Sequence, residues 1–327
     1  VMFRTEQLSV LEWAAIMAGT SMTVVIGQTW RWLRDRFASR NNCRCAKPLS
    51  SSDGAYSATV GFFDGVHQGH RFVLRQLLDD ARQHGLQPMV VTFRQHPRHV
   101  LRKEFAPRLL TTPDEKVRLI ASCGIEQIVS VDFTQEFARQ TAEEFMLLLR
   151  DLYGVRRLLV GYDNRFGSDR SQTFADYVAT GRRLGVEVVG LQPLESVGCH
   201  VSSSVVRRLL GDGDVAAAAR LLCRRYTLSG VVVRGYGEGR KLGFPTANMR
   251  FAPELFVPKR GVYAVFVSVE GYDGRLFGGM MNIGCRPTYG EFGETVEVNI
   301  FDFDADIYDR TITVSMVDRV RDERKFD

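Results

Sequence analysis

Residues 59–70 read TVGFFDGVHQGH and join a short β-type run to a helical pattern. The run, residues 57–60, leads into a glycine-bearing turn, and from Phe72 onward apolar residues recur at helical spacing. The sequence therefore predicts a strand, a turn and a helix, with His67 and His70 at the junction.

This junction has the features of a phosphate site. The first N–H groups of a helix are unpaired and the positive end of the helix dipole lies there, which favours anions. His67 and His70 are three residues apart, so they share a helix face and can donate hydrogen bonds to one ligand. Gly65 and Gly69 allow close approach of the backbone. A lone histidine here would more often be a surface or packing residue, whereas the paired spacing is more specific.

The chain continues with a regular alternation of elements as far as about Gly211. Apolar runs alternate with helical periods, which predicts an α/β fold: a Rossmann-like parallel sheet with right-handed crossovers and a ligand crevice at the carboxyl ends of its strands. The predicted strands are residues 57–61, 88–93, 126–131, 157–160 and 186–191, and the predicted helices are residues 71–84, 113–122, 141–152 and 171–184.

After a helix predicted for residues 214–222, the apolar period changes to that of strands. Short β-runs separated by turn residues predict a small antiparallel β-barrel. Its predicted strands are residues 226–234, 261–269, 277–282, 294–303 and 311–318. We therefore divide the chain into an N-terminal extension (1–52), a Rossmann-like domain (53–222) and a barrel domain (223–327).

Residues 1–52 differ in character from the rest of the chain. Residues 13–30 form an uncharged span of 18 residues followed by arginines. This pattern is long enough to be considered as a membrane anchor or a signal peptide. Polar residues inside the span, and Glu6 and Glu12 before it, argue against both. We expect a disordered or non-essential extension and no membrane association.

Length and composition limit the class of protein. A chain of 327 residues favours two domains, and 45% hydrophobic with 25% charged residues is typical of a globular protein. A net charge of +5 suits anionic small molecules and does not indicate nucleic-acid binding. The six cysteines are scattered and form no zinc motif, which favours free thiols in a reducing, cytoplasmic compartment.

Two further motifs are expected at the crevice of the sheet, GYDNRFG at residues 161–167 and VSSSVVR at residues 201–207. The first follows a predicted strand directly. The second opens a helix whose serines could either cap it or bind phosphate, with Arg207 one turn further on. Taken singly, each motif is as well explained by a loop or by a capped helix, but three such features on one sheet favour a phosphate site.

The second domain carries its own candidate site. A glycine-rich loop at residues 235–240 runs into LGFPTAN at residues 242–248. Such loops cradle phosphates, although barrel hairpins use the same residues. Thr246 and Asn248 would offer neutral oxygens to Mg²⁺. Glu297 lies on the polar face of a predicted strand. Its side chain could simply be solvated there, or it could serve as the general base for a hydroxyl, and the sequence leaves both interpretations open.

Together these motifs resemble the bacterial bifunctional riboflavin kinase/FMN adenylyltransferase family, also called FAD synthetases. The resemblance runs from about Tyr56 to Asp327. It is carried, in the family's order, by GFFDGVHQGH, TFRQHP, GYDNRFG, VSSSVVR, GRKLGFPTAN, GVYAV, NIGCRPTYG and RDERKFD.

The resemblance implies two reactions. The barrel would phosphorylate riboflavin to FMN with ATP and Mg²⁺, and the first domain would adenylylate FMN to FAD, with direct attack of FMN on ATP and release of pyrophosphate. The catalytic residues that it implies are His67, His70, Arg207 and Glu297. The ATP-binding or phosphate-binding residues would be Gly61, Phe62, Asp64, Gly65, Ser203, Ser204, Gly237, Gly239, Arg240 and Gly243. Flavin would bind at Asp163, Arg165 and Pro245, and metal at Thr246 and Asn248.

The sequence departs from the family in several places. Many relatives carry a polar residue at the position of Phe62, a Glu-Pro pair at residues 94–95 and a histidine at Asn299. In the family a helix usually follows the KFD stretch, and with the sequence ending at Asp327 we expect a weakened or open riboflavin site. A second hypothesis is therefore an FMN adenylyltransferase with an inactive kinase domain, and a third is a non-catalytic flavin- or nucleotide-binding regulator. The expected partners are ATP, riboflavin and FMN; the oligomeric state is not predicted.

Overall fold

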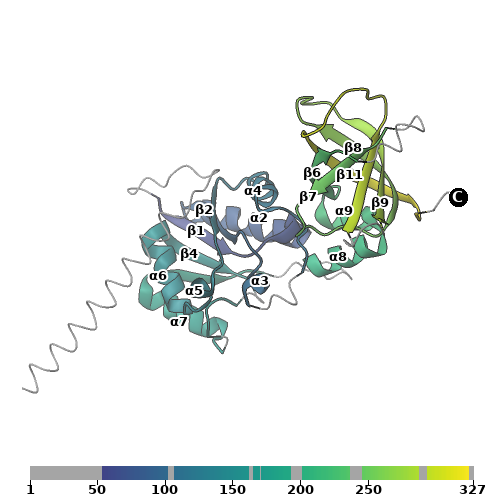
Figure 1. The fold of residues 1–327 in the computed structure, drawn as a ribbon. Helices are drawn as coiled ribbons and strands as arrows, with labels where there is room; N and C mark the ends of the chain where they lie inside the picture. Colours follow the sequence, from purple (N-terminus) through teal and green to yellow (C-terminus); the bar gives the residue numbers. More distant parts are fainter. Residues whose placement is uncertain are drawn as a thin grey trace, which may run out of the picture.

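The computed structural model describes residues 54–101, 107–161, 165–169, 171–192, 201–235, 245–286 and 293–323. These residues form two modules, a layered α/β module and a β-barrel (Figure 1). The extension predicted at residues 1–52 lies outside the described residues.

Five strands form the sheet of the first module, and each confirms a predicted strand with small shifts at its ends: β1 (Tyr56–Val60), β2 (Gln87–Phe93), β3 (Gln127–Val131), β4 (Val155–Val160) and β5 (Glu187–Gly190). They pair in parallel in the order β3-β2-β1-β4-β5. The central strand β1 is buried throughout its length. A continuous apolar run is the expected pattern for a strand that is covered on both faces.

Helices cover both faces of this sheet, and four of them confirm predicted helices: α2 (Gln68–Gln83), α4 (Pro113–Ala121), α6 (Ala142–Tyr153) and α7 (Phe174–Leu184). On one face, Leu74 of α2 and Ile120 of α4 pack with Val90 of β2. On the other, Phe145 of α6 and Tyr177 of α7 pack with the opposite side chains of the strands. Three short helices were not predicted, because they are too brief to show a period: η1 (Asp64–Val66), α3 (Pro97–Leu101) and α5 (Gln135–Ala138).

The second module confirms the predicted antiparallel barrel, with the strands β6 (Thr227–Val233), β7 (Ala247–Phe251), β8 (Gly261–Val269), β9 (Phe277–Arg286), β10 (Gly293–Ile300) and β11 (Thr311–Arg321). The barrel is closed in the order β10-β7-β6-β11-β8-β9. Strand β7 was missed by the sequence analysis, because it is short, follows Pro245 and buries a single side chain, that of Met249. Closure nevertheless requires it, since β7 pairs with both β6 and β10.

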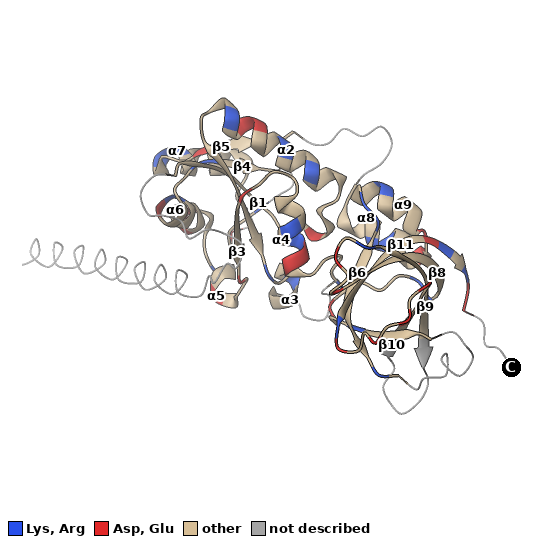
Figure 2. Cartoon of the chain, turned by 90° about the horizontal axis from the view of Figure 1, so that it is seen from above, with Lys and Arg blue, Asp and Glu red and all other residues tan. Residues whose placement is uncertain are grey.

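Two helices, α8 (Ser203–Asp212) and α9 (Val215–Leu222), lie beside the barrel, with α9 next to β11 (Figure 2). Their apolar faces share one core with the barrel and with Leu109 and Leu110, which precede α4. The N–H of Leu109 donates to the carbonyl of Glu254 at 2.6 Å, and the N–H of Phe256 donates to the carbonyl of Leu109 at 2.7 Å. The two modules are therefore joined by packing as well as by the chain, and the domain limit predicted after residue 222 stays a prediction.

Candidate active sites

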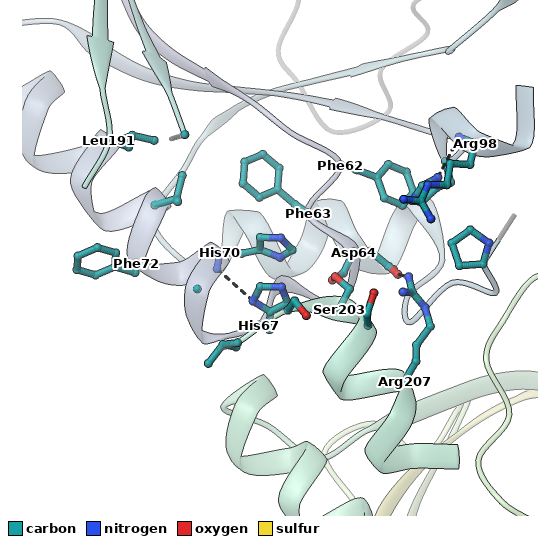
Figure 3. Close-up of a pocket in the computed structure, with 18 of the residues that line it drawn as sticks. Phe62, Phe63, Asp64, His67, His70, Phe72, Arg98, Leu191, Ser203 and Arg207 are labelled. Atoms are coloured by element: carbon teal, nitrogen blue, oxygen red, sulfur yellow. Dashed lines mark hydrogen bonds and ion pairs between the residues drawn. The ribbon is translucent and has the colours of Figure 1, made fainter. Parts of the chain in front are cut away.

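A pocket of about 480 Å³ opens at the carboxyl end of β1, where a parallel sheet is expected to bind its ligand. The starts of two helices meet there, because α2 begins at Gln68 and α8 begins at Ser203. Figure 3 shows His67, His70 and Asp64 around this pocket, with Ser203 and Arg207 of α8 next to Asp64.

The turn between β1 and α2 has an unusual backbone. Phe63, Gly65 and Val66 all have positive φ angles, of 54°, 78° and 42°. A Cβ atom on Gly65 would lie 2.8 Å from a methyl carbon of Leu110, so both the conformation and the packing require glycine. Backbone strain of this kind persists where the surrounding structure holds it, and it is common at functional sites.

The two histidines form a stacked pair at the start of α2. Their ring centroids are 3.6 Å apart with an angle of 18° between the planes. The backbone N–H of His70 donates to Nδ1 of His67 at 3.4 Å, which leaves the ring hydrogen of a neutral His67 on Nε2. Nδ1 of His70 is buried and has no hydrogen-bond partner among the described residues.

Both imidazoles are neutral near pH 7. Burial, with a smaller contribution from Arg207, lowers the pKa of His67 to about 4. Burial also lowers the pKa of His70, and the nearby His67 and Lys116 lower it further. The pair can therefore donate N–H groups to a phosphate without carrying a charge in the free protein.

Asp64 connects the turn to α8. Its Oδ2 accepts a hydrogen bond from Nη2 of Arg207 at 2.5 Å, and its Oδ1 accepts one from the N–H of Leu110 at 2.9 Å. The hydroxyl of Ser203 donates to the backbone carbonyl of Asp64 at 3.0 Å. Burial raises the pKa of Asp64, and the nearby charges of Arg207 and Lys116 oppose that rise. Because both carboxyl oxygens accept bonds from donors, the geometry suits the ionised form.

The barrel carries a second polar cluster on its outer surface. Val296 and Val298 point into the barrel core, so Glu297 between them faces outward. In the register of the strands, Glu297 of β10 lies opposite Asn248 of β7 and Asn282 of β9. A carboxylate is thus flanked by two amides on adjacent strands.

The residues predicted to bind metal lie beside this carboxylate. A Cβ atom on Gly235 would lie only 2.2 Å from the amide nitrogen of Asn248, so that amide packs tightly against the backbone of Gly235. Thr246 and Pro245 line a neighbouring pocket of about 220 Å³. Two neutral oxygens beside a carboxylate suit Mg²⁺, which binds to few protein ligands and keeps waters or substrate phosphates as the others.

The structure brings many of the predicted site residues together. The first pocket is lined by Phe62, Asp64, His67, His70, Ser203, Ser204 and Arg207. Gly61 and Gly65 belong to the same turn but are not among the described residues of the lining, and the exposed Arg165 lies outside it as well. The remaining predictions fall outside the described residues: Asp163, Gly237, Gly239, Arg240 and Gly243.

The sequence analysis overlooked three residues at these sites. Asn282 begins the motif NIGCRPTYG but was given no role, although it lies opposite Glu297. His96 lines the first pocket and contacts Phe62 edge to face, with 4.6 Å between the ring centroids. Lys116 is buried beneath Phe62. A signal for Lys116 was present, because it lies four residues before Ile120 on the apolar face of its helix.

The fold and the two clusters define a class of protein. A Rossmann-like module with a phosphate-suited helix junction is joined to a barrel that bears a carboxylate with its amide neighbours, as expected of a two-module, nucleotide-dependent transferase. A family model described as FAD synthetase matches residues 49–205, and a model described as riboflavin kinase matches residues 222–327. The chain belongs to the family of bifunctional riboflavin kinases/FMN adenylyltransferases.

The similarity to curated proteins extends over most of the chain. The bifunctional riboflavin kinase/FMN adenylyltransferase of Escherichia coli (strain K12) is 37% identical over 270 residues, which is 82% of this chain and 85% of that protein. The protein of the same name from Bacillus subtilis (strain 168) is 35% identical over 274 residues, with 82% and 84% covered.

A solved structure shares the fold. It is described as a macrolide-efflux protein from Streptococcus pneumoniae, and it matches with a TM-score of 0.76 and 32% identity over 85% of this chain and 90% of that chain. Within the described part of the present chain, no helix has the length and apolar character needed to cross a membrane.

Proposed function

We propose that this chain converts riboflavin into FAD in two ATP-dependent steps, the first at the barrel and the second at the parallel sheet. The proposal rests above all on the presence of both clusters in one chain, the stacked imidazoles with Arg207 and the carboxylate of Glu297 between two amides. The bacterial relatives carry both activities in their names.

In the first step, Glu297 accepts the proton of the terminal ribityl hydroxyl of riboflavin. The hydroxyl oxygen then attacks the γ-phosphorus of ATP, so that FMN forms and ADP leaves. A carboxylate within reach of the hydroxyl is suited to this general-base role. Asn248 and Asn282 flank Glu297 and are placed to orient the groups that it contacts.

We assign a Mg²⁺ ion to the oxygens of Thr246 and Asn248. When bound, it would neutralise charge on the ATP phosphates during transfer. The close contact of Asn248 with Gly235 holds the amide in place for this task.

In the second step, a phosphate oxygen of FMN attacks the α-phosphorus of ATP and pyrophosphate leaves. The reaction needs alignment and stabilisation of charge rather than a covalent enzyme intermediate. The neutral imidazoles of His67 and His70 donate N–H groups to the phosphates, while Arg207 supplies positive charge beside Asp64. Ser203 fixes α8 to the turn and so fixes Arg207.

Product analysis with two variants tests the assignment of one step to each module. With riboflavin, ATP and Mg²⁺, the wild type is expected to form FMN and then FAD. His70→Asn should reduce FAD formation by about a hundredfold and leave FMN formation intact, because the shorter asparagine cannot place an N–H group where Nε2 of the imidazole lies. Glu297→Gln should abolish FMN formation but still convert added FMN into FAD. Equal damage to both steps by either variant would contradict the assignment.

The same assays separate the alternatives. FAD from added FMN, with no FMN from riboflavin, would indicate an FMN adenylyltransferase with an inactive barrel. Tight binding of flavin or ATP without either product would indicate a regulator. Because both proposed steps consume ATP, we place the enzyme in the cytoplasm.

A further inference from the structure

A lysine is buried next to the pocket at the sheet and has no role in the steps described above. Lys116, on α4, is only 2% exposed. Its ammonium nitrogen donates to the carbonyl of Phe93, the last residue of β2, at 2.6 Å, and lies 3.8 Å from the centroid of the Phe62 ring. One cation therefore contacts both a strand end and an aromatic side chain of the pocket wall.

This position is unfavourable for a charged side chain. Lys116 shares the buried face of α4 with Val117 and Ile120, where an apolar residue would pack without loss of hydration. Burial lowers the pKa of Lys116 to about 7, while the charge of Asp64 raises it. A buried, perturbed lysine beside a pocket is a candidate for a functional role.

The neighbouring charges indicate what that role is. Asp64 is buried and forms an ion pair with Arg207. Lys116 lies near the same carboxylate, because its helix α4 packs against η1, which carries Asp64, and each of the two groups shifts the pKa of the other. Below about pH 7, where Lys116 is protonated, two cations and one anion leave one net positive charge beside the pocket. Without Lys116, the charge of Arg207 would be balanced by Asp64 alone.

We propose that Lys116 is a positioning residue for adenylyl transfer. Its positive charge offsets part of the negative charge of Asp64, so that Arg207 keeps its attraction for polyphosphate. Its contacts also hold Phe62 and the end of β2 in place. It acts through these groups rather than on the reacting atoms. The inference rests on the proposed role of this pocket in forming FAD from FMN.

The test compares Lys116→Met with Lys259→Met, since Lys259 is exposed on the barrel module. Lys116→Met should lower kcat/KM for ATP in the FMN adenylyltransferase reaction by roughly 10- to 100-fold, because one charge beside the phosphates is lost. Riboflavin phosphorylation in the same protein should be unchanged, because its proposed site lies on the barrel module. Lys259→Met should retain both activities.

The pH dependence of kcat/KM distinguishes an effect of the charge of Lys116 from an effect of its packing. Lys116 loses its proton as the pH rises through about 7, so the advantage of the wild type over Lys116→Met in kcat/KM should be largest at pH 6 and smaller at pH 8.5. The ratio cancels the titration of ATP and FMN themselves. The charged or titratable groups around Lys116 are Asp64 of η1, His70 of α2, His96 after β2 and Arg207 of α8.

Three results would overturn the inference: full adenylylation by Lys116→Met at pH 6, a ratio that does not change with pH, or equal loss of both activities together with Tm. If Lys116→Met does not fold, Lys116→Gln replaces it, since the amide can still donate to the carbonyl of Phe93 without a charge. A wild type that forms no FAD from FMN would instead refute the proposed function, so the two failures are distinguishable.

Discussion

At the scale of single residues, the first site depends on burial as much as on residue type. The spacing of His67 and His70 is visible in the sequence, and the structure confirms that both lie at the start of one helix. Their neutrality is not visible there, because it comes from burial beneath distant segments and from the charges of Arg207 and Lys116. The sequence alone assigns Asp64 to phosphate binding, whereas in the structure its side chain forms an ion pair with Arg207.

The buried histidines should make the protein sensitive to acid. The pKa of His67 is lowered from 6.5 to about 4 in the folded protein, so the unfolded chain binds more protons between these values. The free energy of unfolding should therefore fall as the pH decreases below about 6.5, and His67 alone should contribute roughly 1–2 kcal/mol of that fall by pH 5. Urea unfolding at pH 7 and pH 5 measures it.

His67→Asn provides the comparison for this measurement. Asparagine is a favourable N-cap residue and does not titrate, so the helix start is kept while the proton site is removed. The variant should lose less stability between pH 7 and pH 5 than the wild type does. An identical loss in both proteins would show that His67 is not buried in its neutral form.

At the scale of elements, long periodic segments could be predicted and short ones could not. All five strands of the parallel sheet follow from apolar runs, because such runs are required where both faces are covered. Strand β7 could not be predicted, since its place in the barrel is set by pairing with β6 and β10 rather than by the apolar pattern of its own sequence. That pairing is also what brings Asn248 beside Glu297, so this part of the second site required the structure.

The fit between Gly235 and β7 gives a test at this scale. In Gly235→Ala the new methyl group would lie 2.2 Å from the amide nitrogen of Asn248 and would displace it. Riboflavin phosphorylation should fall by about tenfold or more, since the amide is lost from a polar site that must be held in place. FAD formation from added FMN should continue.

Gly211→Ala is a suitable control for that variant, because its methyl group would meet only Phe256, at an ordinary 3.7 Å. It should retain both reactions. Normal phosphorylation by Gly235→Ala, measured as FMN formed from riboflavin and ATP, would remove Asn248 from the proposed metal site.

At the scale of the whole molecule, the two modules are connected but keep separate sites. Thr227 of β6 donates to Glu115 of α4 at 2.6 Å, and the neighbouring Lys116 lies beside the first pocket. The resemblance in sequence predicts two modules in this order, and the family match confirms it. The shared core of α8, α9 and the barrel could not be predicted, because it depends on contacts between segments far apart in the chain.

Mixing two variants tests the central claim, that each module performs one step and that FMN links them. With riboflavin, ATP and Mg²⁺, His70→Asn alone should accumulate FMN, and Glu297→Gln alone should form neither FMN nor FAD. An equimolar mixture of the two should form FAD, because FMN released by the first protein is adenylylated by the second. FAD formed from riboflavin by Glu297→Gln alone would contradict the account. So would a mixture that forms no FAD although each variant retains its own step.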